Sequence, residues 1–397
     1  MGAASLGAAS PGAAPSDVVD LDPVFVGRQE SLHGLEAAFA SGLRLVTLLG
    51  APGLGKSRLA RRFAAGQVAQ GLSTFWIEVE ARLESDELLA RMATAVGAQP
   101  AERGAAGLEV VIESLRVQGS LLLVLDGLEA SLGPARALLE GLLSRCPELR
   151  ILSTSQAPLG LLGEQRFELS PLDRAEADAL FRARARQAMH TFEVLERDER
   201  VLESLLDQLE RVPLAIELAA GHVGTLSLVE LERRLAPDAT PLPSPRRDGP
   251  PRHRTMGEAV AWAWSLLDPS LQRALADLSV FRGPFTVEGA EAVLSPGRNP
   301  GPLEAVERLR ERSLLRRVGG RGRLQILGEV RRFAEQRRGV EDVPLRARHA
   351  RWFAGRLDRT IDVMYGMPSS VDLEDHELEQ DDLRAALAFG EEHDPEA

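Results

Sequence analysis

Hydrophobic and polar positions divide the chain into two regions with different patterns. Up to residue 170, five short runs are apolar along most of their length: LRLVTLLG, STFWIEV, LLLVLDG, LRILSTS and QRFELS. Between them, apolar residues recur every three or four positions, as in ESDELLARMATAVG and PARALLEGLLSRC. Apolar strands separated by helices of about 10 to 15 residues predict a parallel sheet that helices cover on both faces.

After Pro171 the strand pattern stops and the helical pattern continues. DRAEADALFRARARQAM and the long stretch over residues 197–224 predict a helical domain. Residues 236–255 are rich in Pro and Arg and indicate a linker. Beyond them come short helices, then two short strands about a Gly-rich turn in LRRVGGRGRLQIL, then helices to the end. Helices followed by such a hairpin indicate a winged helix.

These patterns predict six segments. The expected boundaries are a disordered, Ala/Gly/Pro/Ser-rich start at 1–22, a sheet domain at 23–170, a helical domain at 171–235, the linker at 236–255, a winged helix at 256–345 and a helical segment with an acidic end at 346–397. The paired tryptophans of AVAWAW, Trp262 and Trp264, are expected in the core of the winged helix rather than on a base-stacking surface.

Charge is unevenly spread over a chain with a net charge of −12. Residues 236–360 hold 23 Arg against 15 Asp or Glu, whereas residues 371–397 hold 11 acidic residues and one arginine, Arg384. The basic region could meet an acidic partner, and the acidic end of the same chain is the nearest candidate. The alternative is an ordinary solvated surface.

Other features of the composition exclude several classes of protein. No apolar run approaches the length of a membrane span, and the first residues lack the pattern of a signal peptide. The one cysteine, Cys146, allows neither an internal disulfide nor a thiol-based metal site. We therefore expect a cytoplasmic protein without a membrane partner and without structural metals.

One stretch carries recognisable chemistry. Gly50–Ser57 reads G-x-x-x-x-G-K-S and lies between a predicted strand and a predicted helix, which is the setting that a phosphate-binding loop requires. Gly53 and Gly55 let the backbone curl so that successive N–H groups point at one anion. Lys56 is the only lysine in the chain, and its compact ammonium can reach between phosphates where a planar guanidinium cannot.

A second motif supplies the groups that such a loop needs. We expect Ser57 and Asp126, at the end of LLLVLDG, to hold a magnesium ion. Many proteins of this kind place a second acid directly after the strand aspartate, but here that residue is Gly127. Glu129 is the nearest carboxylate that could position the attacking water. It could equally be a solvated or helix-capping acid.

The motifs FVGRQESL, the phosphate loop, LLLVLDGLE, RILSTSQAPLGLLGE and VPLAIELAA follow one another in an order that resembles STAND ATPases. These are signal-transduction ATPases with numerous domains, relatives of the NB-ARC proteins. The resemblance is closest to the branch found in large bacterial transcriptional regulators. It implies an α/β P-loop NTPase fold of the AAA+ and STAND type, followed by a helical lid, a winged helix that closes over the nucleotide at rest, and a short helical C-terminus.

The resemblance also implies a site for ATP or ADP with Mg²⁺. Val26, Gly27 and Arg28 would hold the adenine and ribose, and Pro213 would press on the adenine from the lid. The phosphates would meet the loop and its neighbours: Gly50, Gly53, Leu54, Gly55, Lys56, Ser57, Arg58 and Gln156. Lys56, Asp126 and Glu129 would form the catalytic set.

Three positions depart from the family pattern. Gln156 stands where an arginine usually senses the γ-phosphate, and it brings no charge. Arg211 replaces a glycine at the start of the lid motif. Where some relatives place a histidine against ADP, the stretch ILGEVRRFA offers Gly328 or Glu329, so locking of ADP by that route is not expected.

The sequence therefore predicts an ATP-binding switch with slow, magnesium-dependent hydrolysis, activated through a protein partner or self-association. The main alternative is an adaptor that binds nucleotide without hydrolysing it, because Gly127 and Gln156 weaken the catalytic pattern. DNA binding through the arginines of ERLRERSLLRRVGGRGRL is the less favoured alternative.

Overall fold

The computed structural model describes residues 24–79, 82–98, 104–235, 256–294, 299–318, 322–338, 342–364 and 370–393. The predicted disordered start and the predicted linker at 236–255 lie outside the described residues. The chain forms two compact units, each described here by itself. The first contains residues up to 49 together with 55–183, and the second contains residues 50–54 together with 184–397.

The first unit is built on one parallel sheet of five strands in the order β2-β3-β4-β1-β5. The strands are β1 (Leu45–Leu49), β2 (Ser73–Glu78), β3 (Leu121–Asp126), β4 (Leu149–Ser155) and β5 (Glu164–Glu168). Every residue of β1 and β3 is buried, which explains why these strands read as continuous apolar runs. All five predicted strands are confirmed, and β4 lies between β1 and β3.

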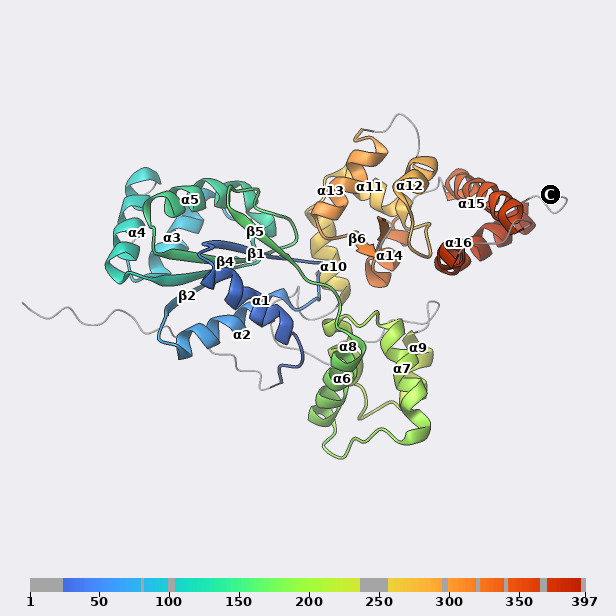
Figure 1. The fold of residues 1–397 in the computed structure, drawn as a ribbon, viewed down its shortest axis with the longest axis horizontal. Coiled ribbons are helices and arrows are strands. Elements are labelled where there is room, and N and C mark those ends of the chain that lie inside the picture. Colours follow the sequence, from blue (N-terminus) through green and yellow to red (C-terminus); the bar gives the residue numbers. More distant parts are fainter. Residues whose placement is uncertain are drawn as a thin grey trace, which may run out of the picture. The chain divides into compact units, whose positions relative to one another are not determined.

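Helices cover both faces of this sheet (Figure 1). One core joins the strands to α3 (Ser85–Ala95), α4 (Gly104–Gln118) and α5 (Leu132–Arg145). The other joins them to α1 (Gln29–Ala40) and α2 (Lys56–Ala69). The predicted two-sided α/β architecture is therefore confirmed.

The larger segment of the second unit begins at Arg184, inside α6 (Arg174–Ala188). Helices α7 (Glu199–Gln208), α8 (Pro213–Ala220) and α9 (Leu228–Leu235) follow. A buried ion pair between Arg184 and Glu217 (2.8 Å) ties the end of α6 to α8. The stretch over residues 197–224, which was predicted to be helical, is interrupted between Gln208 and Pro213. The interruption occurs because Glu210 and Arg211 adopt left-handed backbone angles (φ 48° and 54°).

After residue 255 the second unit contains five helices and one hairpin among its described residues up to 338. They are α10 (Met256–Ser265), α11 (Pro269–Leu278), α12 (Val287–Val293), α13 (Pro302–Glu311), β6 (Arg316–Val318), β7 (Arg323–Gln325) and α14 (Gly328–Glu335). β6 and β7 pair antiparallel, as predicted. Trp264 packs edge-on against Phe333 of α14, with ring centres 5.7 Å apart. Trp262 and Trp264 were expected in the core, but both are only half-buried.

The chain continues with α15 (Asp342–Met364) and α16 (Ser370–His393). Two acids of α16 reach into the basic region. Glu379 accepts hydrogen bonds from Arg323 (2.8 Å) and Arg356 (2.9 Å). Asp382 accepts from His349 Nε2 and from the backbone turn after α11. The acidic end of the chain is therefore a partner of the basic region, as the charge pattern suggested.

Candidate functional site

The predicted phosphate loop connects β1 to α2 in the backbone conformation that the motif requires. Gly53 and Gly55 have φ angles of 80° and 86°, a left-handed region that favours glycine. Gly55 is the N-cap of α2 and has no side chain to occupy the helix start. Lys56 and Ser57 are the first two residues of α2. The N–H groups at this helix end are suited to an anion.

Within the second unit, the loop residues Gly50–Leu54 contact the start of α8. Leu214 N–H donates to Gly53 O (3.2 Å). A Cβ at Gly53 would lie 2.8 Å from Met256 Sδ and 3.2 Å from Leu214 Cβ, so the position tolerates only glycine. Pro213, which was predicted to touch the adenine, is the first residue of α8 and precedes Leu214.

Asp126 ends β3 and is 1% exposed. Its carboxylate accepts a hydrogen bond from Thr154 Oγ1 (2.5 Å), and the same hydroxyl accepts one from Gly127 N–H (2.9 Å). Thr154 lies opposite Asp126 on β4. This hydroxyl therefore fixes the orientation of the carboxylate that was predicted to hold magnesium. The sequence reasoning did not single out Thr154.

Glu129 lies in a short 3₁₀ helix, Leu128–Ala130, just after Asp126. Its side chain is largely buried, and its Oε2 atom has no hydrogen-bond partner among the described residues. A buried carboxylate oxygen without a partner is costly, so a water molecule or a ligand is expected to satisfy it. This observation favours the water-positioning hypothesis over a solvated surface acid, while the helix-capping alternative stays open because Glu129 lies in the first turn of the 3₁₀ helix.

The sheet order brings these groups to one edge. β4 separates β1 from β3, and parallel strands end at the same edge of a sheet. The loop after β1, Gln156 after β4 and Asp126 at the end of β3 therefore share the carboxyl edge. Gln156 directly follows Ser155, the last residue of β4, and is itself buried (5% exposed) at this edge. Ligands of open α/β sheets bind at this edge.

The N-terminal motif is held by a residue that the sequence reasoning missed. Gly27 and Arg28 both adopt left-handed angles (φ 71° and 61°), and Arg28 N–H donates to Glu176 Oε1 (2.6 Å). A Cβ at Gly27 would lie 2.4 Å from the same oxygen. Glu176 also accepts from Asp173 N–H, and Asp173 caps α6 in return. The D-x-x-E spacing was a visible capping signal, but it did not reveal the contact with Arg28.

The guanidinium of Arg28 is anchored as well. It donates to Ser170 O (2.5 Å). Burial lowers the pKa of Arg28, and the carboxylates of Glu176 and Asp173 oppose that shift. Arg58, predicted to contact nucleotide, donates to Val24 O. Val26 lies between these two anchored points. Arg58 thus attaches the N-terminal motif to α2.

Gly328 and Glu329, the positions at which the resemblance suggested a histidine, both have hydrogen-bond partners within the second unit. Gly328 N–H donates to the Glu210 carboxylate, and Glu329 pairs with Arg332 on α14.

The arrangement fits a nucleotide with a divalent cation. The loop leads into the start of α2, where backbone N–H groups suit an anion, and Glu129 Oε2 has no hydrogen-bond partner among the described residues. No group of three or more His, Cys, Asp and Glu side chains that could hold a metal ion occurs among the described residues. Mg²⁺ binds through one or two protein oxygens together with phosphates and water, and Ser57 and Asp126 offer oxygens of this kind. Among the described residues, no helix combines the length and the hydrophobicity of a membrane span.

Comparison with known proteins identifies similar chains. A family model described as "NACHT domain" matches residues 44–188. "Putative HTH-type transcriptional regulator Rv0890c" of Mycobacterium tuberculosis is 31% identical over 360 residues, which are 88% of this chain and 40% of that protein. "Uncharacterized protein Rv0894" of the same organism is 32% identical over 287 residues, 72% of each chain. The chain thus spans 40% of the length of the first of these relatives.

Among solved structures, the "walker-type atpase" paby2304 of Pyrococcus abyssi superposes with a TM-score of 0.55 and 16% sequence identity. The match covers 80% of this chain and 99% of that one. At this identity the similarity concerns the fold alone, which is that of a P-loop NTPase with a parallel sheet and many helices.

Proposed function

Because the chain belongs to the STAND class of P-loop ATPases and carries a NACHT domain over residues 44–188, we propose that it is a switch that binds ATP and hydrolyses it slowly. The nucleotide state would change the arrangement of its domains. The observation that carries this proposal is the carboxyl edge of the sheet. There, the phosphate loop follows β1, and Thr154 fixes the buried Asp126 two strands away.

Phosphate binding falls to the start of α2. The N–H groups after Gly53 and Gly55 surround the phosphates, and the Lys56 ammonium reaches the β- and γ-phosphates. Ser57 and Asp126 would hold a magnesium ion, which when bound offsets the negative charge of the phosphates. Thr154 keeps the Asp126 carboxylate in one orientation, so the charge is presented without reorganisation.

Hydrolysis requires that a water molecule be positioned for attack. Glu129 Oε2, buried and without a partner among the described residues, would accept a hydrogen bond from that water. The water oxygen bonds to the γ-phosphorus as the bond to the β–γ bridging oxygen breaks. This leaves ADP and phosphate. Gln156 can donate a hydrogen bond to the γ-phosphate but adds no positive charge, and the reaction is therefore slow.

Base recognition is proposed for the N-terminal motif. Val26, Gly27 and Arg28 would hold the adenine and ribose, with the backbone of this segment fixed by Glu176 and Arg58. Pro213, at the start of α8, would contact the adenine. We further propose that residues 171–235 act as the lid and that residues 256–345, with the hairpin β6–β7, are a winged helix.

We do not extend DNA binding to this chain, although one relative is named a transcriptional regulator. Four arginines of the basic stretch already have partners inside the second unit. Arg308 pairs with Asp268, Arg312 donates to Leu266 O, Arg316 donates to Gln325 and Arg323 pairs with Glu379. Burial lowers the pKa of Arg312 and of Arg316. These guanidinium groups support packing rather than contact with DNA phosphates.

The test measures phosphate release and the nucleotide-induced rise in Tm for the full chain with Mg-ATP. We expect turnover well below the roughly 1–100 s⁻¹ of kinases and a rise in Tm of about 5–10 °C. Lys56→Arg should lose most of that rise, because the guanidinium does not fit between the phosphates. Glu129→Gln should keep the rise and lose about 10²-fold or more in turnover.

Glu140→Gln, which removes an exposed carboxylate from α5, is the matched control and should behave like the parent. If the parent binds ATP with no measurable turnover, the chain is a nucleotide-binding adaptor and the hydrolysis proposal fails. If neither ATP nor ADP changes the Tm of the parent, nucleotide binding itself is wrong.

A further inference from the structure

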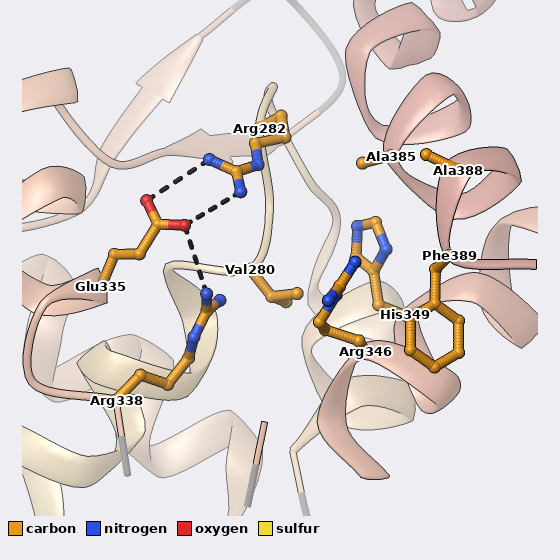
Figure 2. A pocket seen from close by; sticks show the side chains of 9 residues that line it. All are labelled: Val280, Arg282, Glu335, Arg338, Arg346, His349, Ala385, Ala388 and Phe389. Carbon is orange, nitrogen blue, oxygen red and sulfur yellow. Dashed lines mark hydrogen bonds and ion pairs between the residues drawn. The ribbon is translucent and has the colours of Figure 1, made fainter. Parts of the chain in front are cut away.

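A cavity of about 430 Å³ lies in the second unit, at the contact between the body of that unit and the last two helices. Its wall on one side comes from the turn after α11 and the end of α14. On the other side it comes from α15 and α16 (Figure 2). Concave sites of about 300–1,000 Å³ are the size that small molecules occupy. Nothing in the proposed nucleotide chemistry uses this cavity.

Arginines dominate the polar part of the wall. The nine lining residues include Arg282, Arg338 and Arg346 but one carboxylate, Glu335. Figure 2 shows that carboxylate between Arg282 and Arg338, while Arg346 stands on the opposite side beside Phe389. Arg282 donates to Glu335 Oε1 (2.9 Å) and Arg338 donates to the same oxygen (3.2 Å).

Glu335 has a third arginine partner besides Arg282 and Arg338. Arg331, behind the wall, also donates to it (3.5 Å). Burial lowers the pKa of Arg331, and the nearby positive charges of Arg282 and Arg332 lower it further. The carboxylates of Glu335 and Glu210 act in the opposite direction. One carboxylate thus serves three guanidinium groups. Across the cavity, Arg346 meets Glu392 at 3.5 Å, at an exposed position.

A buried carboxylate outside the cavity, Asp382, fixes the part of the wall that contains Arg282 and His349. Asp382 of α16 is completely buried and accepts hydrogen bonds from Arg282 N–H (2.7 Å), Gly283 N–H (2.8 Å) and His349 Nε2 (2.8 Å). These bonds fix the backbone of Arg282. They also fix the His349 ring, which lines the cavity. Val280 and Phe389 add an apolar surface beside the charged groups. A ligand would therefore meet positions that are already organised.

We propose that this cavity is a binding site for a small organic dianion, a phosphate monoester or a dicarboxylate, held by Arg338 and Arg346 with Arg282. Guanidinium groups bind both kinds of oxyanion through paired N–H donors. Val280 and Phe389 accommodate the apolar body of the ligand. Because the ligand contacts both Arg338, just after α14, and the α15–α16 pair, its binding strengthens the attachment of α15 and α16 to the body of the second unit.

The test uses two probes with the same ring, phenyl phosphate and phthalate, in isothermal titration against the full chain. All titrations use a Lys56→Ala background, so that binding at the phosphate loop does not contribute to the comparison. Arg338→Gln and Arg346→Gln are the variants. Arg337→Gln and Arg351→Gln remove the same charge beside them, from exposed side chains that do not line the cavity.

We expect each cavity variant to weaken binding by about tenfold or more and each control to leave it unchanged. Binding of phenyl phosphate alone would identify the ligand as a phosphate monoester, and binding of phthalate alone would identify a dicarboxylate. If neither probe binds at roughly 10 mM, or if the cavity variants bind as tightly as the controls, the proposal is wrong. Because Lys56 is absent throughout, neither result depends on the proposed nucleotide function.

Discussion

Among single residues, Thr154 has the clearest effect that can be measured. Its buried hydroxyl donates to Asp126 Oδ1 and accepts from Gly127 N–H at the same time. Asp126 and Gly127 are both buried, so bulk water cannot replace the hydroxyl as a hydrogen-bond partner if it is removed. At the proposed magnesium site, the side chain would therefore act through Asp126 rather than by contact with the ion.

We expect Thr154→Val, which keeps the shape and loses the hydroxyl, to lower the free energy of unfolding by about 1–3 kcal/mol. It should also raise the Mg²⁺ concentration for half-maximal ATP hydrolysis by about 10-fold or more, since Asp126 loses its orienting partner. Thr154→Ser keeps the hydroxyl and should restore the magnesium dependence. Loss of stability with an unchanged magnesium dependence would assign Thr154 a packing role only.

Among the structural elements, the connection from α7 to α8 is the most unusual. Glu210 and Arg211 are consecutive residues with left-handed φ angles, where an L side chain costs roughly 1–2 kcal/mol each. The resemblance to STAND ATPases leads us to expect a glycine at the position of Arg211. Its ion pair with Asp207 (3.7 Å) is exposed on both sides and contributes little.

Arg211→Gly should therefore stabilise the chain by up to about 1 kcal/mol, because relief of strain exceeds the added entropy of the unfolded glycine. Equilibrium denaturation in urea measures this change. Arg211→Ala removes the same ion pair and keeps the strain, so it should bring no gain. Equal stability of the two variants would show that the backbone angle at this position is not strained.

Glu210 makes the same connection sensitive to pH. Burial raises the pKa of Glu210. The hydrogen bond from Gly328 N–H and the positive charges of Arg316 and Arg331 lower it, but burial has the larger effect. The folded chain therefore holds this proton to a higher pH than the unfolded chain does. Its contribution to stability is present at low pH and is lost as the pH rises above about 4.3, the ordinary value for glutamate, through the folded pKa.

Glu210→Gln removes this titration. We expect the Tm of the parent to fall relative to that of Glu210→Gln as the pH rises from about 4 towards neutrality. Thermal melts of both chains in matched buffers measure the difference. Tm curves that stay parallel over this range would contradict the expectation.

At the scale of the whole molecule, the contact between α16 and the rest of the second unit depends on a few buried charged side chains. Asp382 has no exposed surface, and its two oxygens accept three hydrogen bonds, two of them from the turn Arg282–Gly283. Asn can accept at one oxygen only, and its NH₂ group would face a backbone N–H donor. The α15–α16 pair therefore depends on this carboxylate as well as on its apolar contacts.

Asp382→Asn should lower stability by about 1–3 kcal/mol and speed hydrogen exchange at the amides of α16 and of residues 280–283. Asp381→Asn is the control, because Asp381 pairs with Arg384 on the exposed surface of the same helix. Exchange rates at α16 that do not change in Asp382→Asn would mean that apolar packing alone holds the helix.

The strands, the phosphate loop and the hairpin could be read from the sequence because each depends on neighbouring residues. Buried parallel strands are apolar along their length, and the loop needs its glycines, Lys56 and Ser57 in one uninterrupted stretch. Asp126 and Glu129 were proposed as site residues because they lie at the end of such a strand and just after it. The uneven charge also pointed to the pairing of the acidic end with the basic region, although it could not say which acids take part.

Other features depend on residues that are far apart in the chain. Thr154 lies 28 positions from Asp126, Glu176 lies 148 from Arg28, Glu210 lies 118 from Gly328 and Asp382 lies 100 from Arg282. Such contacts leave no periodic signal, because either residue alone has several satisfactory partners and burial decides among them. The sequence therefore defines the elements and the loop, whereas the packing of those elements selects the side chains that orient the site and produces the arginine-lined cavity.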